Sequence, residues 1–230
     1  MKQLLLNIQP AQLPTLENFV TGDNSELLQA LRNLVKDASS QRSLVLWGPS
    51  GSGKTHLLRA AVQHAALQQQ AALYLDAPDE IAINSAQGDV VALDHVERLD
   101  ETAQIALFNL FNRFREQGKA LLVAASSAPS QLELRDDLKT RLGWGLVYQV
   151  ISLTDAEKAE ALKQHARERG MRLPEEVVEY CLRHLRRDLP TLMATLDALD
   201  DWSLTAKKPV TVAMVRQMVQ NDSPDTCNFL

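Results

Sequence analysis

A glycine-rich segment from Gly48 to Thr55 constrains this sequence more than any other, because it joins a short apolar run to a helical pattern. The apolar run is Ser43-Leu-Val-Leu-Trp47, and the segment itself reads Gly-Pro-Ser-Gly-Ser-Gly-Lys-Thr. Its glycines permit the positive φ angles and the close backbone approach that wrapping a polyphosphate requires. The spacing is that of a phosphate-binding P-loop, in which backbone N–H groups and the N-terminus of the next helix face the anion.

The positions within this segment have separate expected roles. Lys54 would reach the β and γ phosphates of a nucleotide, and the Thr55 hydroxyl would hold Mg²⁺. The alternative is a glycine-rich turn without a ligand, but the four fixed positions would match by chance in roughly one chain of this length in a hundred. The sequence therefore predicts nucleotide binding through Gly48, Pro49, Ser50, Gly51, Ser52, Gly53, Lys54, Thr55 and His56.

The composition is that of an ordinary globular protein and argues against several classes of function. The chain has 230 residues, of which 45% are hydrophobic and 23% charged, and its apolar runs are too short to span a bilayer. The N-terminus lacks the features of a signal peptide, and Cys181 and Cys227 form neither a disulfide framework nor a metal motif. We expect a cytoplasmic protein with no membrane partner and, at a net charge of −5, no strong direct DNA binding.

Apolar runs and helical patterns alternate up to about residue 152. Five runs, over 43–47, 71–75, 90–93, 120–124 and 147–151, are typical of strands buried on both faces of a parallel sheet. Residues 77–88 are expected to form an irregular connection, with room for one helical turn. Asp100 or Thr102 is expected to start the next helix, whose buried face would consist of Ile105, Leu107, Phe108, Leu110, Phe111 and Phe114.

From Leu153 onward the sequence predicts helices only, and a capping box from Thr154 to Glu157 starts the first of them. The expected architecture is α/β, with a five-stranded parallel sheet followed by an α-helical lid. The expected boundaries are an extended tail over 1–20, a P-loop core over 21–152, the lid over 153–220 and a flexible tail over 221–230.

Asp94 ends the third apolar run. A carboxylate at the end of a buried strand, in a chain that also has a P-loop, fits a Walker B residue that holds Mg²⁺. The alternative is an acidic turn after a strand. We expect Thr55 and Asp94 to hold the metal together.

A P-loop core with a small helical lid is the layout of AAA+ proteins, and this chain resembles their DnaA/Hda subfamily. The resemblance rests on the P-loop, Asp94, Leu138-Lys-Thr-Arg-Leu142 with Trp144-Gly145, Leu16-Glu-Asn-Phe-Val20 with Gly22, and Thr191-Leu-Met-Ala-Thr-Leu-Asp197. It implies an AAA+ fold, bound ADP or ATP with Mg²⁺, Ser126 as the sensor 1 residue, and Phe19 and Val20 as the wall on the adenine side.

The resemblance also implies weak hydrolysis at the chain's own site. His95 follows Asp94 where hydrolytic AAA+ proteins usually carry glutamate, although a neutral imidazole could accept a proton and Glu97 lies two residues further on. Pro190 stands where a lid arginine usually faces the phosphates, and proline is tolerated in a first helical turn. Arg186 or Arg187 could substitute for that arginine or could simply be solvated.

Arg141 resembles the arginine finger of the subfamily's box VII segment. Such an arginine reaches across a subunit interface and stabilises the charge that develops on a neighbour's γ-phosphoryl group. The alternative is an arginine that interacts favourably with the C-terminal end of its own helix dipole.

The N-terminal Gln3-Leu-Leu-Leu-Asn-Ile8 is similar to the Q-L-x-L-x-[LF] peptide that docks on the replicative sliding clamp. Gln3, Leu4, Leu6 and Ile8 would enter polar and apolar sub-pockets as an extended segment. Isoleucine replaces the usual leucine or phenylalanine at the last position. The alternative is an edge strand packed on the core.

The resemblance to the DnaA/Hda subfamily then implies a negative regulator of replication initiation. The chain would hold ADP, bind the sliding clamp (the polymerase β subunit) on DNA, and present Arg141 to ATP-bound DnaA to trigger hydrolysis. A homo-oligomer is compatible with this interpretation. The alternatives are DnaA itself, whose basic helix-turn-helix domain has no counterpart here, a freestanding ATPase such as a helicase loader, and a catalytically silent adaptor with a structural P-loop.

Overall fold

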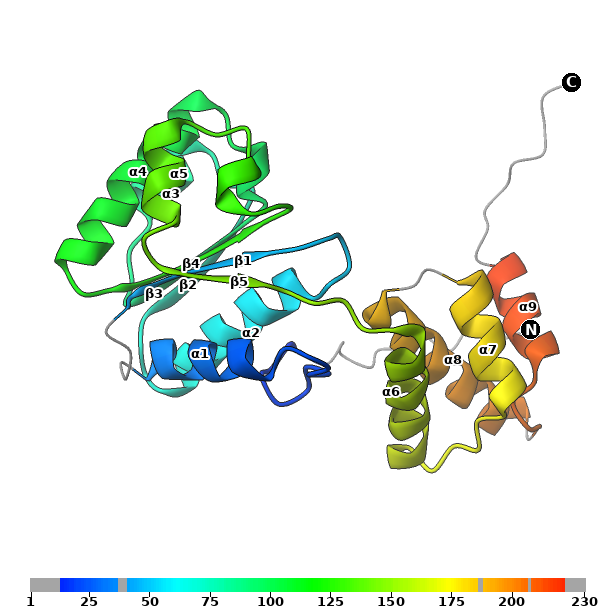
Figure 1. Cartoon of the computed structure of the whole chain (residues 1–230). Coiled ribbons are helices and arrows are strands. Elements are labelled where there is room, and N and C mark those ends of the chain that lie inside the picture. Colours follow the sequence, from blue (N-terminus) through cyan, green and yellow to red (C-terminus); the bar gives the residue numbers. More distant parts are fainter. Residues whose placement is uncertain (1–12, 37–40, 186–187, 207, 222–230) are drawn as a thin grey trace, which may run out of the picture. The chain divides into compact units, whose positions relative to one another are not determined.

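The computed structural model describes residues 13–36, 41–185, 188–206 and 208–221. The chain divides between Ile151 and Ser152 into two compact units, an α/β unit and a helical unit (Figure 1). Within the described residues, no helix combines the length and the apolar character needed to cross a membrane.

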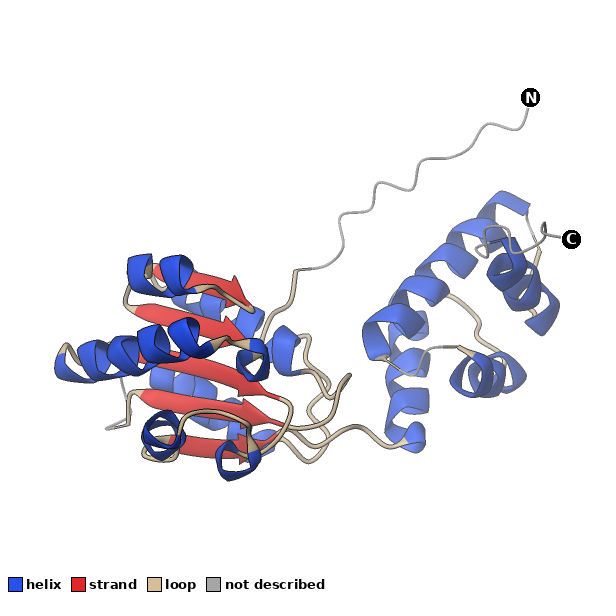
Figure 2. Ribbon diagram, turned by 90° about the horizontal axis from the view of Figure 1, so that it is seen from above, coloured by secondary structure: helices blue, strands red, loops and turns tan. Residues whose placement is uncertain are grey.

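A five-stranded parallel sheet forms the centre of the first unit (Figure 2). Its strands are β1 (Ser43–Trp47), β2 (Ala72–Asp76), β3 (Val90–Asp94), β4 (Ala120–Ala125) and β5 (Leu146–Gln149), in the order β2-β3-β4-β1-β5. This confirms the predicted sheet, although β5 begins and ends earlier than its apolar run suggested. Every residue of β3 and β4 is buried, because helices cover both faces of the sheet.

Two groups of helices cover the two faces of the sheet (Figure 1). On one face, α1 (Ser25–Val35) and α2 (Lys54–Leu67) share a core with strand residues such as Leu44, Leu46 and Ala92. On the other face, α3 (Glu80–Ser85), α4 (Glu101–Glu116) and α5 (Asp136–Leu142) pack on Val45, Leu93 and Val123. Two 3₁₀ turns, η1 (Val96–Arg98) and η2 (Pro129–Gln131), complete the connections.

Three local expectations need correction. The connection over 77–88 contains a six-residue helix, α3, because the Asp79 carboxylate accepts a hydrogen bond from the Ala82 amide and caps its N-terminus. Ile105 is 42% exposed and not buried, since it lies on the outer side of α4. Leu16, assigned to the N-terminal tail, is only 2% exposed and belongs to the same core as α1 and α2.

The second unit consists of α6 (Asp155–Glu168), α7 (Glu175–His184), α8 (Leu189–Ala206) and α9 (Val212–Asn221). The predicted capping box is present, with reciprocal bonds between Thr154 and Glu157 at the start of α6. A separate apolar core, including Leu162, Val178 and Leu196, holds the helices together. This confirms the predicted C-terminal helical unit.

Candidate functional site

The segment between β1 and α2 has the backbone geometry of an anion-binding loop. Gly48, Gly51 and Gly53 all have positive φ angles, of 154°, 77° and 102°. A Cβ atom on Gly48 would lie 2.7 Å from the Val150 carbonyl oxygen, and one on Gly53 would lie 2.7 Å from the Phe19 ring. Both positions therefore require glycine for conformation and for space.

Lys54 begins α2 and turns its side chain back over the loop. Its Nζ atom donates hydrogen bonds to the carbonyl oxygens of Gly48 (2.7 Å) and Pro49 (2.9 Å). Burial lowers the pKa of Lys54, and the carboxylates of Asp94 and Glu97 oppose this shift. With Gly53 at the N-cap, no side chain caps the start of α2, so its first N–H groups and its dipole are available to a phosphate.

Thr55 and Asp94 are in direct contact, although 39 positions separate them in the sequence. The Thr55 hydroxyl donates to Asp94 Oδ2 (2.6 Å), and the Tyr74 hydroxyl donates to the same oxygen (3.0 Å). Asp94 is fully buried at the end of β3, and burial is the main reason why the pKa of Tyr74 rises to about 12. A hydroxyl and a carboxylate are ligands that suit Mg²⁺, so this pair fits the expected metal site.

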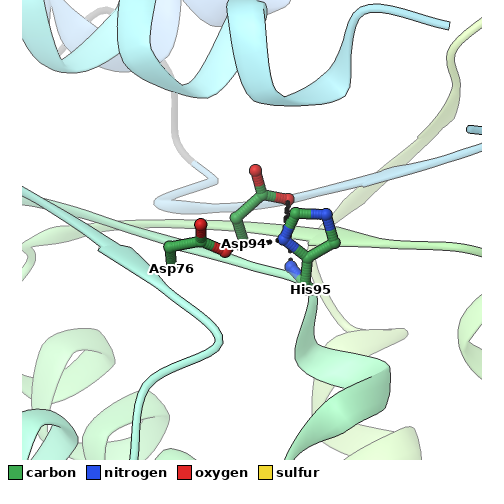
Figure 3. A group of neighbouring side chains, drawn as sticks. All are labelled: Asp76, Asp94 and His95. Atoms are coloured by element: carbon green, nitrogen blue, oxygen red, sulfur yellow. Dashed lines mark hydrogen bonds and ion pairs between the residues drawn. The ribbon is translucent and has the colours of Figure 1, made fainter. Parts of the chain in front are cut away.

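His95 is held by a residue that the sequence analysis did not single out (Figure 3). Its Nδ1 atom lies 2.7 Å from Asp76 Oδ1, and its amide donates to Asp94 Oδ1 (2.9 Å). Asp76 ends β2 directly beside Asp94, because these two residues are partners in the parallel register. The only signal in the sequence was a second apolar run that also ended in aspartate. With Nδ1 engaged, His95 has one ring nitrogen, Nε2, for any other partner.

Two buried polar atoms in this region have no hydrogen-bond partner among the described residues: Ser52 Oγ in the loop and Glu97 Oε2 in η1. The charge of Glu97 acts on Lys54, which places its carboxylate near the loop. Buried polar atoms are normally paired with protein, water or a ligand. These two atoms are therefore available to a ligand or its water.

The segment before α1 reaches the loop through Phe19. The Phe19 ring contacts Gly53 and lies 5.5 Å, between ring centroids, from the ring of His56. His56 Nε2 donates to the Thr15 carbonyl (3.0 Å), so this imidazole fastens residues 13–20 to α2. Val20, in the same segment, is half-buried. Ser126 is exposed and directly follows β4. In the sheet β4 lies between β3, which ends in Asp94, and β1, which leads into the loop.

Arg141 lies away from this cluster in sequence and on the opposite face of the sheet from α2, in the last turn of α5. Its guanidinium carbon is 3.8 Å from the centre of the Trp144 ring and 5.4 Å from that of Phe108. Among the described residues it has no ion-pair partner.

The other residues predicted to take part in function lie in the helical unit and near the N-terminus. Pro190 is the second residue of α8, and the Asp188 carboxylate accepts a hydrogen bond from the Thr191 amide at this N-terminus. The peptide with Gln3, Leu4, Leu6 and Ile8 lies outside the described residues, as do Arg186 and Arg187.

Comparison with known families covers most of the chain. Residues 11–79 and 79–149 match the model of the bacterial DnaA ATPase domain, and residues 155–219 match that of the Hda lid domain. The chain belongs to the DnaA/Hda family of AAA+ proteins. A relative from Haemophilus influenzae, described as an uncharacterized protein, is 37% identical over 228 residues, which cover 95% of this chain and 98% of the relative.

Solved structures share the DnaA/Hda fold. Domain III of DnaA from Thermotoga maritima matches with a TM-score of 0.74 at 22% identity, covering 92% of this chain and 97% of that one. AMPPCP-bound DnaA from Aquifex aeolicus matches with a TM-score of 0.69 at 24% identity, over 81% of this chain and 65% of that one. The chain thus spans slightly less than two thirds of the Aquifex protein. The Thermotoga maritima RuvB motor also shares the fold, with a TM-score of 0.68 at 19% identity, over 92% of this chain and 73% of that one.

Proposed function

We propose that this DnaA/Hda protein binds an adenine nucleotide and uses it to regulate a partner's nucleotide hydrolysis. The three positive-φ glycines, the Lys54 ammonium and the uncapped start of α2 form a cradle for a polyphosphate. The AMPPCP-bound state of Aquifex DnaA favours ADP or ATP as the ligand. Thr55 and Asp94 would hold Mg²⁺, which neutralises phosphate charge, and Ser126 and Phe19 would line the site.

Hydrolysis at the chain's own site should be slow. His95 follows Asp94, and its Nδ1 atom is engaged by Asp76, so the position offers no carboxylate to activate water. Pro190 in the first turn of α8 supplies no charge. We therefore propose that the nucleotide, ADP in the resting state, serves a regulatory purpose.

The active group of the proposed function is Arg141, acting in trans on ATP bound to DnaA. The observation that carries this proposal is a partly exposed guanidinium group at the end of α5, stacked on a half-exposed tryptophan and without an ion-pair partner among the described residues. An arginine that only stabilised its own helix would need no such arrangement. In other NTPases an arginine finger raises the rate by about 10³–10⁵.

The sliding clamp is the proposed tether. The support is sequence similarity alone, through Gln3, Leu4, Leu6 and Ile8. Tethering would raise the local concentration of Arg141 near DnaA on DNA. In this proposal the protein lowers the amount of ATP-bound initiator and so limits re-initiation of replication.

The test reconstitutes ATP-bound DnaA, DNA-loaded clamp and this protein, and measures the loss of ATP from DnaA. Wild-type protein should accelerate that loss and Arg141→Ala should not, whereas Arg172→Ala, an exposed arginine of the helical unit, should behave as wild type. Full activity of Arg141→Ala would refute the finger. Gln3→Ala with Leu6→Ala should weaken clamp binding, and unchanged clamp affinity would refute the tether.

Two further measurements separate the alternatives. Fast steady-state ATP turnover by the isolated chain would favour a freestanding ATPase such as a helicase loader. Calorimetry that detects no adenine-nucleotide binding would favour a silent adaptor whose P-loop is only structural.

A further inference from the structure

Trp144 is contacted by two guanidinium groups from different helices. The Arg141 Cζ atom lies 3.8 Å from the centre of its ring, and the Arg115 Cζ atom lies 4.7 Å from it. The tryptophan is 46% exposed, so the three side chains form a surface cluster, hereafter the Arg–Trp–Arg cluster.

The local backbone holds Trp144 in place. The Trp144 amide donates to the Arg141 carbonyl (3.1 Å), which continues the turn at the end of α5. The next residue is Gly145, where a Cβ atom would collide with the Ser43 carbonyl, so the chain after Trp144 runs tightly against the start of β1. The main chain that carries the indole is thus held on both sides.

Helix α4 supplies the other half of the cluster. Phe108 and Arg115 are seven residues apart and therefore share one face of this helix. Phe108 contacts Arg141 and Arg115 contacts Trp144, so both residues meet the end of α5. The aromatic rings of Phe108 and Trp144 therefore both restrict the Arg141 side chain.

Ion pairing distinguishes Arg115 and Arg141 from two neighbouring cations. Arg135, which precedes α5, pairs with Asp137 (3.0 Å), and Lys139 in α5 pairs with Asp136 (2.7 Å). Neither Arg115 nor Arg141 has an ion pair or a side-chain hydrogen bond with any residue that the structure describes. Two neighbouring cations without an anion repel each other, so a shared anion would stabilise the cluster.

Contact with the indole is compatible with binding of such an anion by both arginines. Arginine commonly stacks its planar guanidinium group on an aromatic ring, which leaves the five in-plane N–H donors for other partners. Planar donor pairs match phosphate oxygens well, and a polyphosphate can engage two guanidinium groups at once.

We propose that Trp144 is a positioning residue that holds the Arg141 side chain in place, and that Arg115 is a second anion-binding arginine beside it. Both guanidinium groups then contact the polyphosphate of the nucleotide held by the partner. This inference rests on the proposed function, in which Arg141 acts on that nucleotide.

The experiment compares Arg115→Ala, Trp144→Ala and Trp144→Phe with Arg141→Ala and the Arg172→Ala control. ATP loss from DnaA is measured across a range of concentrations of this protein, which separates the rate at saturation from the concentration for half-maximal stimulation. Thermal unfolding of each variant verifies that its fold is intact.

Arg115→Ala should lower the rate at saturation about tenfold, as expected for a lost charge-assisted contact with phosphate. Trp144→Ala should lower it roughly fivefold, and Trp144→Phe should recover most of that loss because the aromatic face remains. A general structural role for Trp144 would not give rescue by phenylalanine in the rate at saturation.

The outcomes distinguish this inference from the function on which it rests. If Arg141→Ala keeps full activity, the finger itself is wrong. If Arg141→Ala is inactive but Arg115→Ala and Trp144→Ala stimulate like wild type at saturation, only the present inference is overturned. An effect of Arg115→Ala confined to the half-maximal concentration would make Arg115 a docking contact and would refute its role on the phosphates.

Discussion

The Thr55 hydroxyl donates a 2.6 Å hydrogen bond to Oδ2 of Asp94, and so joins the start of α2 to the end of β3. This contact unites the two residues expected to hold Mg²⁺. In a nucleotide complex both oxygens could turn to the metal or its water shell without moving a strand.

The first prediction concerns Asp94→Asn. Loss of the carboxylate should remove most of the gain in ADP affinity that Mg²⁺ provides, by at least about tenfold, while metal-independent binding persists. Calorimetry with Mg²⁺ and with EDTA measures the ratio of the two dissociation constants. Asp76→Asn, one strand away, is the matched control and should retain the Mg²⁺ effect. An unchanged ratio in Asp94→Asn would exclude Asp94 from the metal site.

The second prediction compares two glycines with positive φ angles. Gly53→Ala should abolish nucleotide binding and destabilise the fold by about 2 kcal/mol or more, because φ is 102° and the new methyl group would meet the Phe19 ring. Gly118→Ala, at φ 65° with nothing within 4 Å, should cost only about 1 kcal/mol of backbone strain. Denaturant unfolding measures both, and equal costs would show that contact with Phe19 is unimportant.

The third prediction concerns Asn24, which is 3% exposed and precedes α1. Its side chain accepts a hydrogen bond from the Ile151 amide (2.8 Å) and donates one to the Ile151 carbonyl (2.9 Å). Asn24→Asp would place a carboxylate against that carbonyl, so we expect a loss of about 2–3 kcal/mol in the free energy of unfolding. Asn33→Ala, within α1 itself, is the control and should cost under about 0.5 kcal/mol. Similar losses in the two variants would contradict this role for Asn24.

The fourth prediction concerns the buried thiol of Cys181 in the core of the helical unit. Burial raises its pKa to about 11, so the reactive thiolate is scarce near neutral pH. In a Cys227→Ser background, alkylation at pH 8 should be much slower in the native protein than in urea. Rapid alkylation of the native protein would contradict the burial of the Cys181 thiol.

The same pKa shift predicts how stability depends on pH. Because the folded pKa is raised, the unfolded thiol loses its proton first, and the contribution of Cys181 is present below about pH 9. It should decrease as the pH rises from about 9 to 11. Cys181→Ala should unfold with a weaker pH dependence in this window, measured by denaturant titration. Identical pH dependence in the two proteins would refute the assignment.

Much of the fold follows from local patterns in the sequence. The glycine spacing from Gly48 to Thr55 encodes the loop, because few other residues tolerate its backbone angles. Uninterrupted apolar runs indicate strands covered on both faces, and the Thr154–Glu157 capping box marks the start of α6. The predicted extent of an element was least accurate where a side-chain cap sets its boundary, as the Asp79 cap does for α3.

Other relationships were decided only by the tertiary structure. Asp76 meets His95 because β2 pairs with β3 in a particular register, and no spacing in the sequence specifies that register. Arg115 reaches Trp144 because α4 packs beside α5, which also explains why Phe108 contacts Arg141. Asn24 forms hydrogen bonds with Ile151, although 127 positions separate the two residues in the sequence. Local sequence fixes backbone angles and periodicity, whereas contacts between distant residues depend on the order of strands and the packing of helices. The sequence alone therefore determined the phosphate loop and the layering of the core, and the tertiary structure determined which side chains surround Asp94 and Arg141.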